Sequence, residues 1–169
     1  MNQSIHSRTI TLPVLITLVL VCFGFRPKVA AQGVPGIYEL SFCPSSTLYV
    51  GQEVIPHASV TDSFGNGALS GYVQFQVCQR GRRNPQPSSA CDIDGTARWF
   101  TMRDRWQVNP PGGSLCGFCG TTDPGNACFA WGAQVNPSTI GFRFKYVSQG
   151  SGIADGISAA KDVTWLPLP

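Results

Sequence analysis

Apolar and polar residues alternate along most of the chain after residue 37, in stretches of four to eight residues. This period of two is typical of β-strands that bury one face, and it differs from the period of 3.6 of an amphipathic helix. It predicts strands over residues 38–43, 54–61, 73–78, 127–132, 140–147 and 163–165, and a less regular one over 96–102. Turn sequences separate them, such as Asp94-Gly95 and Asp123-Pro124-Gly125. About seven such strands predict an all-β antiparallel sandwich in which one face of each sheet is buried.

The position of three cysteines within this alternation refines the prediction. Cys43, Cys78 and Cys128 fall on the polar phase of their strands. A buried disulfide between two sheets, as in antibody domains, would need cysteines on the apolar phase. We therefore expect disulfides that connect the outer surfaces of strands to loops.

The chain has seven cysteines, and six remain when Cys22 in the N-terminal apolar segment is set aside. An even number of cysteines in an exported protein predicts a disulfide framework. The six are Cys43, Cys78, Cys91, Cys116, Cys119 and Cys128. Sequence alone leaves the pairing open, although loop sizes favour Cys78 with Cys91, either Cys116 or Cys119 with Cys128, and Cys43 with the remaining one.

The first 31 residues have the pattern of a signal peptide. Arg8 precedes an apolar run over residues 10–25, and Val29-Ala30-Ala31 offers the small residues that signal peptidase requires. The run is shorter than the roughly 20 residues of a membrane span. We predict a signal peptide over 1–31, a single domain over 32–169 and a secreted, periplasmic or cell-surface location, with an uncleaved N-terminal anchor as the alternative.

The net charge of +3 does not describe the predicted domain, because three of the twelve basic residues lie within residues 1–31. The remaining nine basic and nine acidic residues balance. We therefore expect no general affinity for polyanions and no nucleic-acid partner. The low share of charged residues, 12%, together with 19 Gly and 13 Pro, favours short strands and tight turns over helices.

Several segments resemble the strands of bacterial Ig-like domains, the family of the invasin- and intimin-type repeats. The segments are residues 50–54, 58–67 and 71–77 near the start, and 125–131, 141–146 and 163–165 near the end. The resemblance implies an immunoglobulin-like fold, and by analogy a role in adhesion. This chain departs from the family in its six cysteines and in a long insert over about residues 79–126.

The insert carries the candidate binding residues. Arginine supplies planar donors and aromatic rings supply stacking faces, a combination that suits an anionic glycan. The candidates are Arg80, Arg82, Arg83, Trp99, Arg103 and Trp106. The alternative is a solvated loop over a small apolar cluster.

Other motifs give weaker indications of chemistry. Cys116 and Cys119 have the spacing of a thiol–disulfide exchanger or of half a zinc site, but the Gly- and Pro-rich sequence that follows does not favour the helix of a redox motif. Asp92 and Asp94 resemble the start of a calcium loop without its later acidic ligand. His57 has no nucleophile motif beside it.

Together these features predict a secreted, non-enzymatic module for adhesion, surface assembly or partner binding, without metal or cofactor. Its partner would be a protein or glycan at the cell surface. A carbohydrate- or polyanion-binding module and thiol–disulfide exchange at Cys116 and Cys119 are the alternatives.

Overall fold

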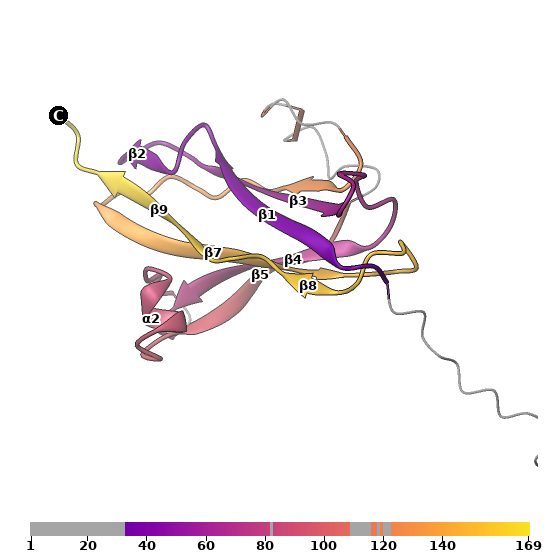
Figure 1. The fold of residues 1–169 in the computed structure, drawn as a ribbon. Coiled ribbons are helices and arrows are strands. Elements are labelled where there is room, and N and C mark those ends of the chain that lie inside the picture. The colour runs from indigo at the N-terminus through magenta and orange to yellow at the C-terminus, as the bar shows by residue number, and fades with distance from the viewer. Residues whose placement is uncertain (1–32, 82, 109–115, 118, 120–122) are drawn as a thin grey trace, which may run out of the picture. The chain divides into compact units, whose positions relative to one another are not determined.

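The computed structural model describes residues 33–81, 83–108, 116–117, 119 and 123–169 (Figure 1). The predicted signal peptide and Arg82 lie outside these residues. Strands are the main regular structure of the described part, and α2 (Ser89–Asp92) is a short helix. Its strands are β1 (Gly36–Cys43), β2 (Thr47–Tyr49), β3 (Ile55–Asp62), β4 (Tyr72–Gln79), β5 (Arg98–Gln107), β6 (Asn126–Cys128), β7 (Ser138–Val147), β8 (Gly156–Ile157) and β9 (Lys161–Leu166).

The strands form two sheets of unequal width, which lie one above the other in Figure 1. The smaller sheet has the order β1-β3-β6, and the larger one has the order β2-β9-β7-β4-β5, with β8 paired to β7. This confirms the predicted all-β sandwich, and each of the seven expected strands is present. The prediction did not include β2 and β8, and β2 pairs with β9 in parallel, so the larger sheet is mixed.

The core between the sheets follows the predicted alternation. Val73, Phe75 and Val77 of β4 are almost completely buried, as are Phe142, Phe144 and Tyr146 of β7. Ala58 and Val60 of β3 face them from the smaller sheet. Burial of one face of each sheet supplies the main favourable free energy of folding. Trp165, also buried, donates its indole N–H to the carbonyl of Gln52 at 2.8 Å.

All six cysteines of the domain form disulfides, and none of the three connects one sheet to the other. Cys78 on β4 pairs with Cys91 in α2, Cys43 on β1 pairs with Cys119, and Cys116 pairs with Cys128 on β6. The bonds therefore attach intervening segments to the outer faces of strands, as the polar phase of Cys43, Cys78 and Cys128 predicted. Cys78 and Cys128 are nevertheless fully buried, because the attached segments cover them.

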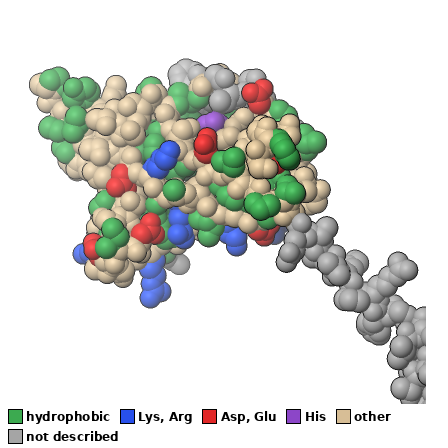
Figure 2. Space-filling view, viewed as in Figure 1, with side chains coloured by type: hydrophobic (Ala, Val, Ile, Leu, Met, Phe, Trp, Pro, Cys, Tyr) green, Lys and Arg blue, Asp and Glu red, His purple; other side chains and the backbone are tan. Residues whose placement is uncertain are grey.

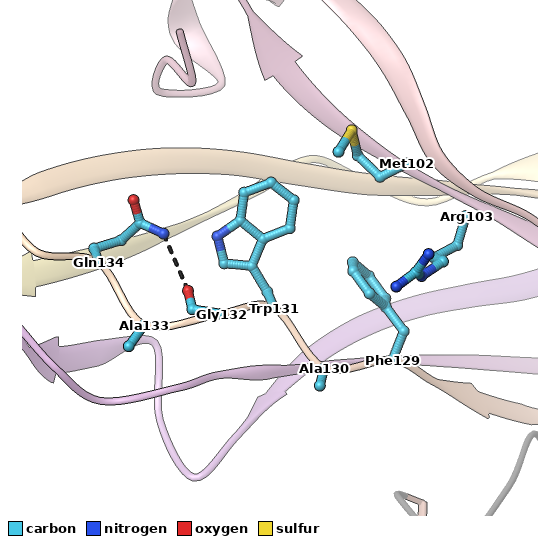
Figure 3. Close-up of a pocket in the computed structure, with 8 residues that line it drawn as sticks. All are labelled: Met102, Arg103, Phe129, Ala130, Trp131, Gly132, Ala133 and Gln134. Carbon is cyan, nitrogen blue, oxygen red and sulfur yellow. Dashed lines mark hydrogen bonds between the residues drawn. The ribbon is translucent and has the colours of Figure 1, made fainter. Parts of the chain in front are cut away.

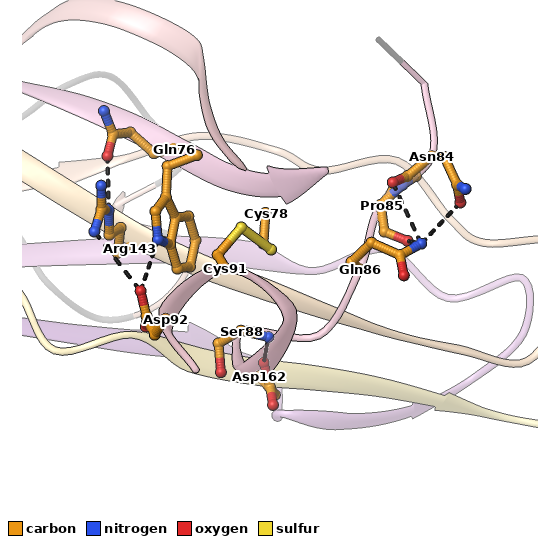
Figure 4. The surroundings of a disulfide bond; sticks show 11 residues. Gln76, Cys78, Asn84, Pro85, Gln86, Ser88, Cys91, Asp92, Arg143 and Asp162 are labelled. Atoms are coloured by element: carbon orange, nitrogen blue, oxygen red, sulfur yellow. Dashed lines mark hydrogen bonds and ion pairs between the residues drawn. A yellow bond between two sulfur atoms is a disulfide. The ribbon is translucent and has the colours of Figure 1, made fainter. Parts of the chain in front are cut away.

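Around the Cys78–Cys91 bond, the segment that contains α2 covers the outer face of the larger sheet (Figure 4). The Ser88 amide donates to the Asp162 carboxylate at 2.8 Å, and the Gly141 amide donates to the Gln86 carbonyl at 2.8 Å. A Cβ atom on Gly141 would lie 2.4 Å from the Ser88 nitrogen, closer than such atoms can approach. Glycine at this position is therefore what allows the segment to lie directly on β7.

Candidate functional site

The unequal width of the sheets leaves one side of the sandwich open. The smaller sheet ends at β6, whereas the larger sheet extends to β5. Between β5 and the residues that follow β6 lies a cavity of about 360 Å³, which we call the open-side cleft (Figure 3). Among the described residues, it is lined by Met102, Arg103, Phe129, Ala130, Trp131, Gly132, Ala133 and Gln134. The volume lies in the range of about 300–1,000 Å³ that is usual for ligand pockets.

One wall of the cleft is shaped by irregular pairing of β5. This strand has ten residues, while its partner β4 has eight, and the register shifts on either side of Phe75. The extra residues are β-bulges, which change the direction in which side chains point. As a result the neighbours Met102 and Arg103 both line the cleft, where regular alternation would place them on opposite faces. Asp104 instead accepts a hydrogen bond from Gln74 at 2.7 Å.

The other wall is the segment Phe129–Gln134, which runs beside the start of β3. The amide of Phe129 donates to the Pro56 carbonyl at 3.2 Å, and Trp131 and Val54 exchange amide–carbonyl bonds of 2.8 and 3.2 Å. In an antiparallel ladder, the residues between such bonded positions direct their backbone groups the other way. The backbone amides of Ala130 and Gly132 therefore point away from β3, on the side of the cleft.

Aromatic rings connect the floor of the cleft to the core. The Phe129 ring lies 4.6 Å from the ring of Phe75, and the Trp131 ring packs edge-on against Phe142 at 5.3 Å. This packing fixes the orientation of both side chains. The Trp131 indole N–H is buried and has no hydrogen-bond partner among the described residues, and Figure 3 shows it turned toward Gln134.

The structure divides the predicted binding residues between two faces of the larger sheet. Arg103 lines the cleft, but Trp99 lies on the opposite face, where it donates to Asp92 at 2.8 Å and stacks under the guanidinium of Arg143 at 4.4 Å. Trp106 packs against the core, and its indole nitrogen is buried. Arg80 and Arg83 are exposed in the turn after β4. These side chains do not form the single patch that the sequence suggested.

Sequence reasoning missed most of the cleft. Alternation predicts an ordinary strand through Gly132, yet regular pairing in β6 ends at Cys128. A signal is present in the small residues beside its aromatic ones, since Ala130, Gly132 and Ala133 leave the backbone accessible.

Basic side chains predominate on β5, the strand that forms one wall of the cleft. Strand β5 carries Arg98, Arg103 and Arg105 but only one acidic residue, Asp104. In Figure 2, most of the visible Lys and Arg side chains lie along the side of the molecule where Figure 1 places β4, β5 and α2. The charge that reaches the cleft itself is that of Arg103, the one charged side chain among the described lining residues.

A second polar cluster crosses the outer face of the smaller sheet. The hydroxyl of Ser41 lies 2.8 Å from Nδ1 of His57, and Nε2 of His57 lies 2.8 Å from Oδ1 of Asn126. Burial lowers the pKa of His57, while the hydrogen bond to Asn126 opposes the shift. The neutral ring, with its proton on Nε2, can accept from Ser41 and donate to Asn126. This row connects β1, β3 and β6 across the sheet.

Three of the remaining sequence candidates, Cys116, Cys119 and Asp92, have structural partners. Cys116 and Cys119 are each bonded to another cysteine and not to each other. The Asp92 carboxylate contacts Trp99 and forms an ion pair with Arg143 at 3.9 Å. Within the described ranges, no three His, Cys, Asp or Glu side chains gather in a way that could hold a metal ion.

Comparisons with known proteins leave the cleft as the main guide to function. No protein-family model matches the chain, and no similar sequence was found among curated proteins. In the part of the chain that the structure describes, no helix has the length and apolar character of a membrane span.

Proposed function

We propose that the chain is an exported, non-enzymatic binding module of immunoglobulin-like type that holds a protein or glycan partner at the cell surface. The observation that carries the proposal is the open-side cleft, in which a bulge turns Met102 and Arg103 toward fixed aromatic rings. Apolar walls with one or two placed polar groups are the usual composition of a binding site. Adhesion and surface assembly are the roles such a module would serve.

Export is supported by chemistry that is independent of the cleft. Three disulfides in one domain are typical of proteins from oxidising compartments. The pattern of residues 1–31 agrees with delivery to such a compartment. Thiol–disulfide exchange has less support, because Cys116 is fully buried and bonded to Cys128.

An anionic glycan is the second candidate ligand. Arg103 lies beside Phe129 in the cleft and offers planar donors, and Trp131 offers part of an aromatic face (Figure 3). Stacking on aromatic rings combined with arginine contacts is a suitable arrangement for a sugar that carries carboxylate or sulfate groups.

The proposal is tested by filling the cleft. Ala133 is an exposed lining residue, so Ala133→Trp should occupy the cavity, whereas Val135→Trp, at a site 86% exposed beyond the lining, is the matched control. Wild-type protein and both variants would be screened on a glycan array and against a displayed library of random peptides. We expect ligands that bind the wild type and the control but not Ala133→Trp. If no ligand depends on position 133, the proposed function is wrong.

A further inference from the structure

We infer that the open-side cleft takes an extended peptide with an acidic side chain, which pairs with the backbone of Phe129–Gly132 as an added strand. The inference rests on the proposed function and specifies the ligand class of the same site. Strand addition gives affinity through main-chain hydrogen bonds, and pockets for alternate side chains give specificity.

The first argument is the free backbone along the segment. Phe129 and Trp131 use their amides in pairing with β3, at 3.2 and 2.8 Å. The amides of Ala130 and Gly132 point away from β3 and have no partner among the described residues. They lie two residues apart, as the donors of an antiparallel edge do. The Gly132 carbonyl accepts a hydrogen bond from the Gln134 side-chain amide at 3.1 Å (Figure 3), so the open groups of this edge are the two amides. The segment is thus an edge of the smaller sheet with free donors at the point where the cleft begins.

The second argument is the composition of this edge. Proteins usually protect an open edge with charged side chains, proline or a bulge. Strand β5 is protected in this way by three arginines and two register shifts. The segment Phe129–Gln134 carries neither a charge nor a proline, and its outward positions hold Ala130 and Gly132. Small side chains there allow another backbone to approach closely.

The third argument is the shape and charge of the space next to this edge. Successive side chains of an added strand point to opposite faces, so alternate ones would enter the cavity against Trp131 and Met102. Among the described lining residues, Arg103 is the only charged one. An acidic side chain in the peptide is complementary to its guanidinium group. A second copy of the chain would bring more arginines to it, which is unfavourable.

A designed peptide pair tests the charge preference directly. The probes are two fluorescein-labelled nonapeptides of alternating Thr and Val, one with Glu and one with Lys at the central position. Fluorescence anisotropy would measure their affinity for the wild-type domain, for Arg103→Glu and for Arg98→Glu. The last variant makes the same charge change on β5 outside the cleft. We expect the Glu peptide to bind the wild type and to lose about tenfold or more in affinity with Arg103→Glu, since charged hydrogen bonds contribute most. The affinity of the Lys peptide should increase with Arg103→Glu. Arg98→Glu should change the affinity of neither peptide by more than about twofold.

The backbone pairing is tested by amide hydrogen exchange. On addition of the Glu peptide, exchange of the Ala130 and Gly132 amides should slow, while the amides of Phe129 and Trp131, already bonded to β3, should change little. Any of three results would overturn the inference. The Glu and Lys peptides could bind equally, the two charge variants could have equal effects, or the Ala130 and Gly132 amides could stay unprotected. Glycan binding that Ala133→Trp abolishes, without peptide binding, would overturn it too and leave the proposed function standing. A dimer that the peptide does not dissociate would assign the edge to a second copy instead.

Discussion

The disulfides allow a quantitative prediction about stability, because they close loops of very different length. Cys43–Cys119 joins residues 76 apart in sequence, and Cys78–Cys91 joins residues 13 apart. Closing a loop of n residues lowers the entropy of the unfolded chain by about 2.1 + 1.5R ln n cal/mol/K. At 25 °C the longer loop then stabilises the fold by about 4.5 kcal/mol and the shorter loop by about 3 kcal/mol. The Cys78–Cys91 bond lies within the longer loop, but the logarithm makes this shortening a small correction.

The corresponding variants are Cys43→Ala/Cys119→Ala and Cys78→Val/Cys91→Ala. Valine at position 78 keeps an apolar side chain at a site that is fully buried, so the comparison reports mainly the loss of the cross-link. Urea unfolding followed by tryptophan fluorescence, without reductant, would give the free energy of unfolding of each. Alkylation and intact mass would verify that the two remaining bonds are intact.

We expect the variant without Cys43–Cys119 to lose about 1.5 kcal/mol more than the variant without Cys78–Cys91. A loss of 4.5 kcal/mol would be a large fraction of the roughly 5–15 kcal/mol of a typical domain, so this variant should also unfold at a much lower temperature. Equal losses, or a larger loss for the short loop, would refute the entropic reasoning. The bonds would then act mainly through the native contacts that they hold in place.

Two further predictions concern the outer faces of the sheets. Burial lowers the pKa of His57 below its ordinary value of 6.5, so the folded state favours the neutral ring. The neutral His57 therefore contributes its full stabilisation above about pH 6.5. This stabilisation is lost as the pH falls through the lower pKa of the folded state. His57→Gln should flatten this part of the stability–pH profile measured by urea unfolding, and an unchanged slope between pH 7 and 5 would contradict the assignment. Gly141→Ala should destabilise the domain by about 1–3 kcal/mol, because the added Cβ meets the Ser88 backbone. The control is Gly132→Ala, whose added Cβ meets nothing within 4 Å. Thermal unfolding would compare the midpoint temperatures of the two variants. An equal decrease in both would show that the contact with Ser88 is not the cause.

The fold was largely predictable because its information is local. Alternation identified the buried faces of β4 and β7, and the phase of Cys78 and Cys128 indicated disulfides on outer surfaces. The two missed strands are short, and β2 exists through its pairing with β9, more than a hundred residues away. Three residues such as Thr47–Tyr49 give no usable periodicity, so only the tertiary contact specifies them as a strand.

The site was much less predictable, because it depends on where regularity fails. A strict alternation along β5 would place Met102 and Arg103 on opposite faces, and the two bulges that bring them to one face leave no clear trace in the sequence. The predicted patch places Arg103 beside Trp99 because the two residues are close in the sequence. In the structure their side chains lie on opposite faces of the larger sheet. The cleft itself follows from the difference in width between the sheets, which no single strand encodes.

The disulfides of β1 and β6 also determine how the domain would respond to tension. The bonds Cys43–Cys119 and Cys116–Cys128 form a covalent path from β1 to β6 that bypasses the chain between Cys43 and Cys116. When the two ends are pulled apart, this bypassed part, which includes β4 and β5, cannot add to the extended length even after its sheet contacts break. Only the residues before Cys43, after Cys128 and in the short link between the bonds can lengthen, by at most about 3.6 Å each. A domain that anchors a partner at a cell surface would thereby limit its extension under load, and its reduced form would stretch much further at the same force.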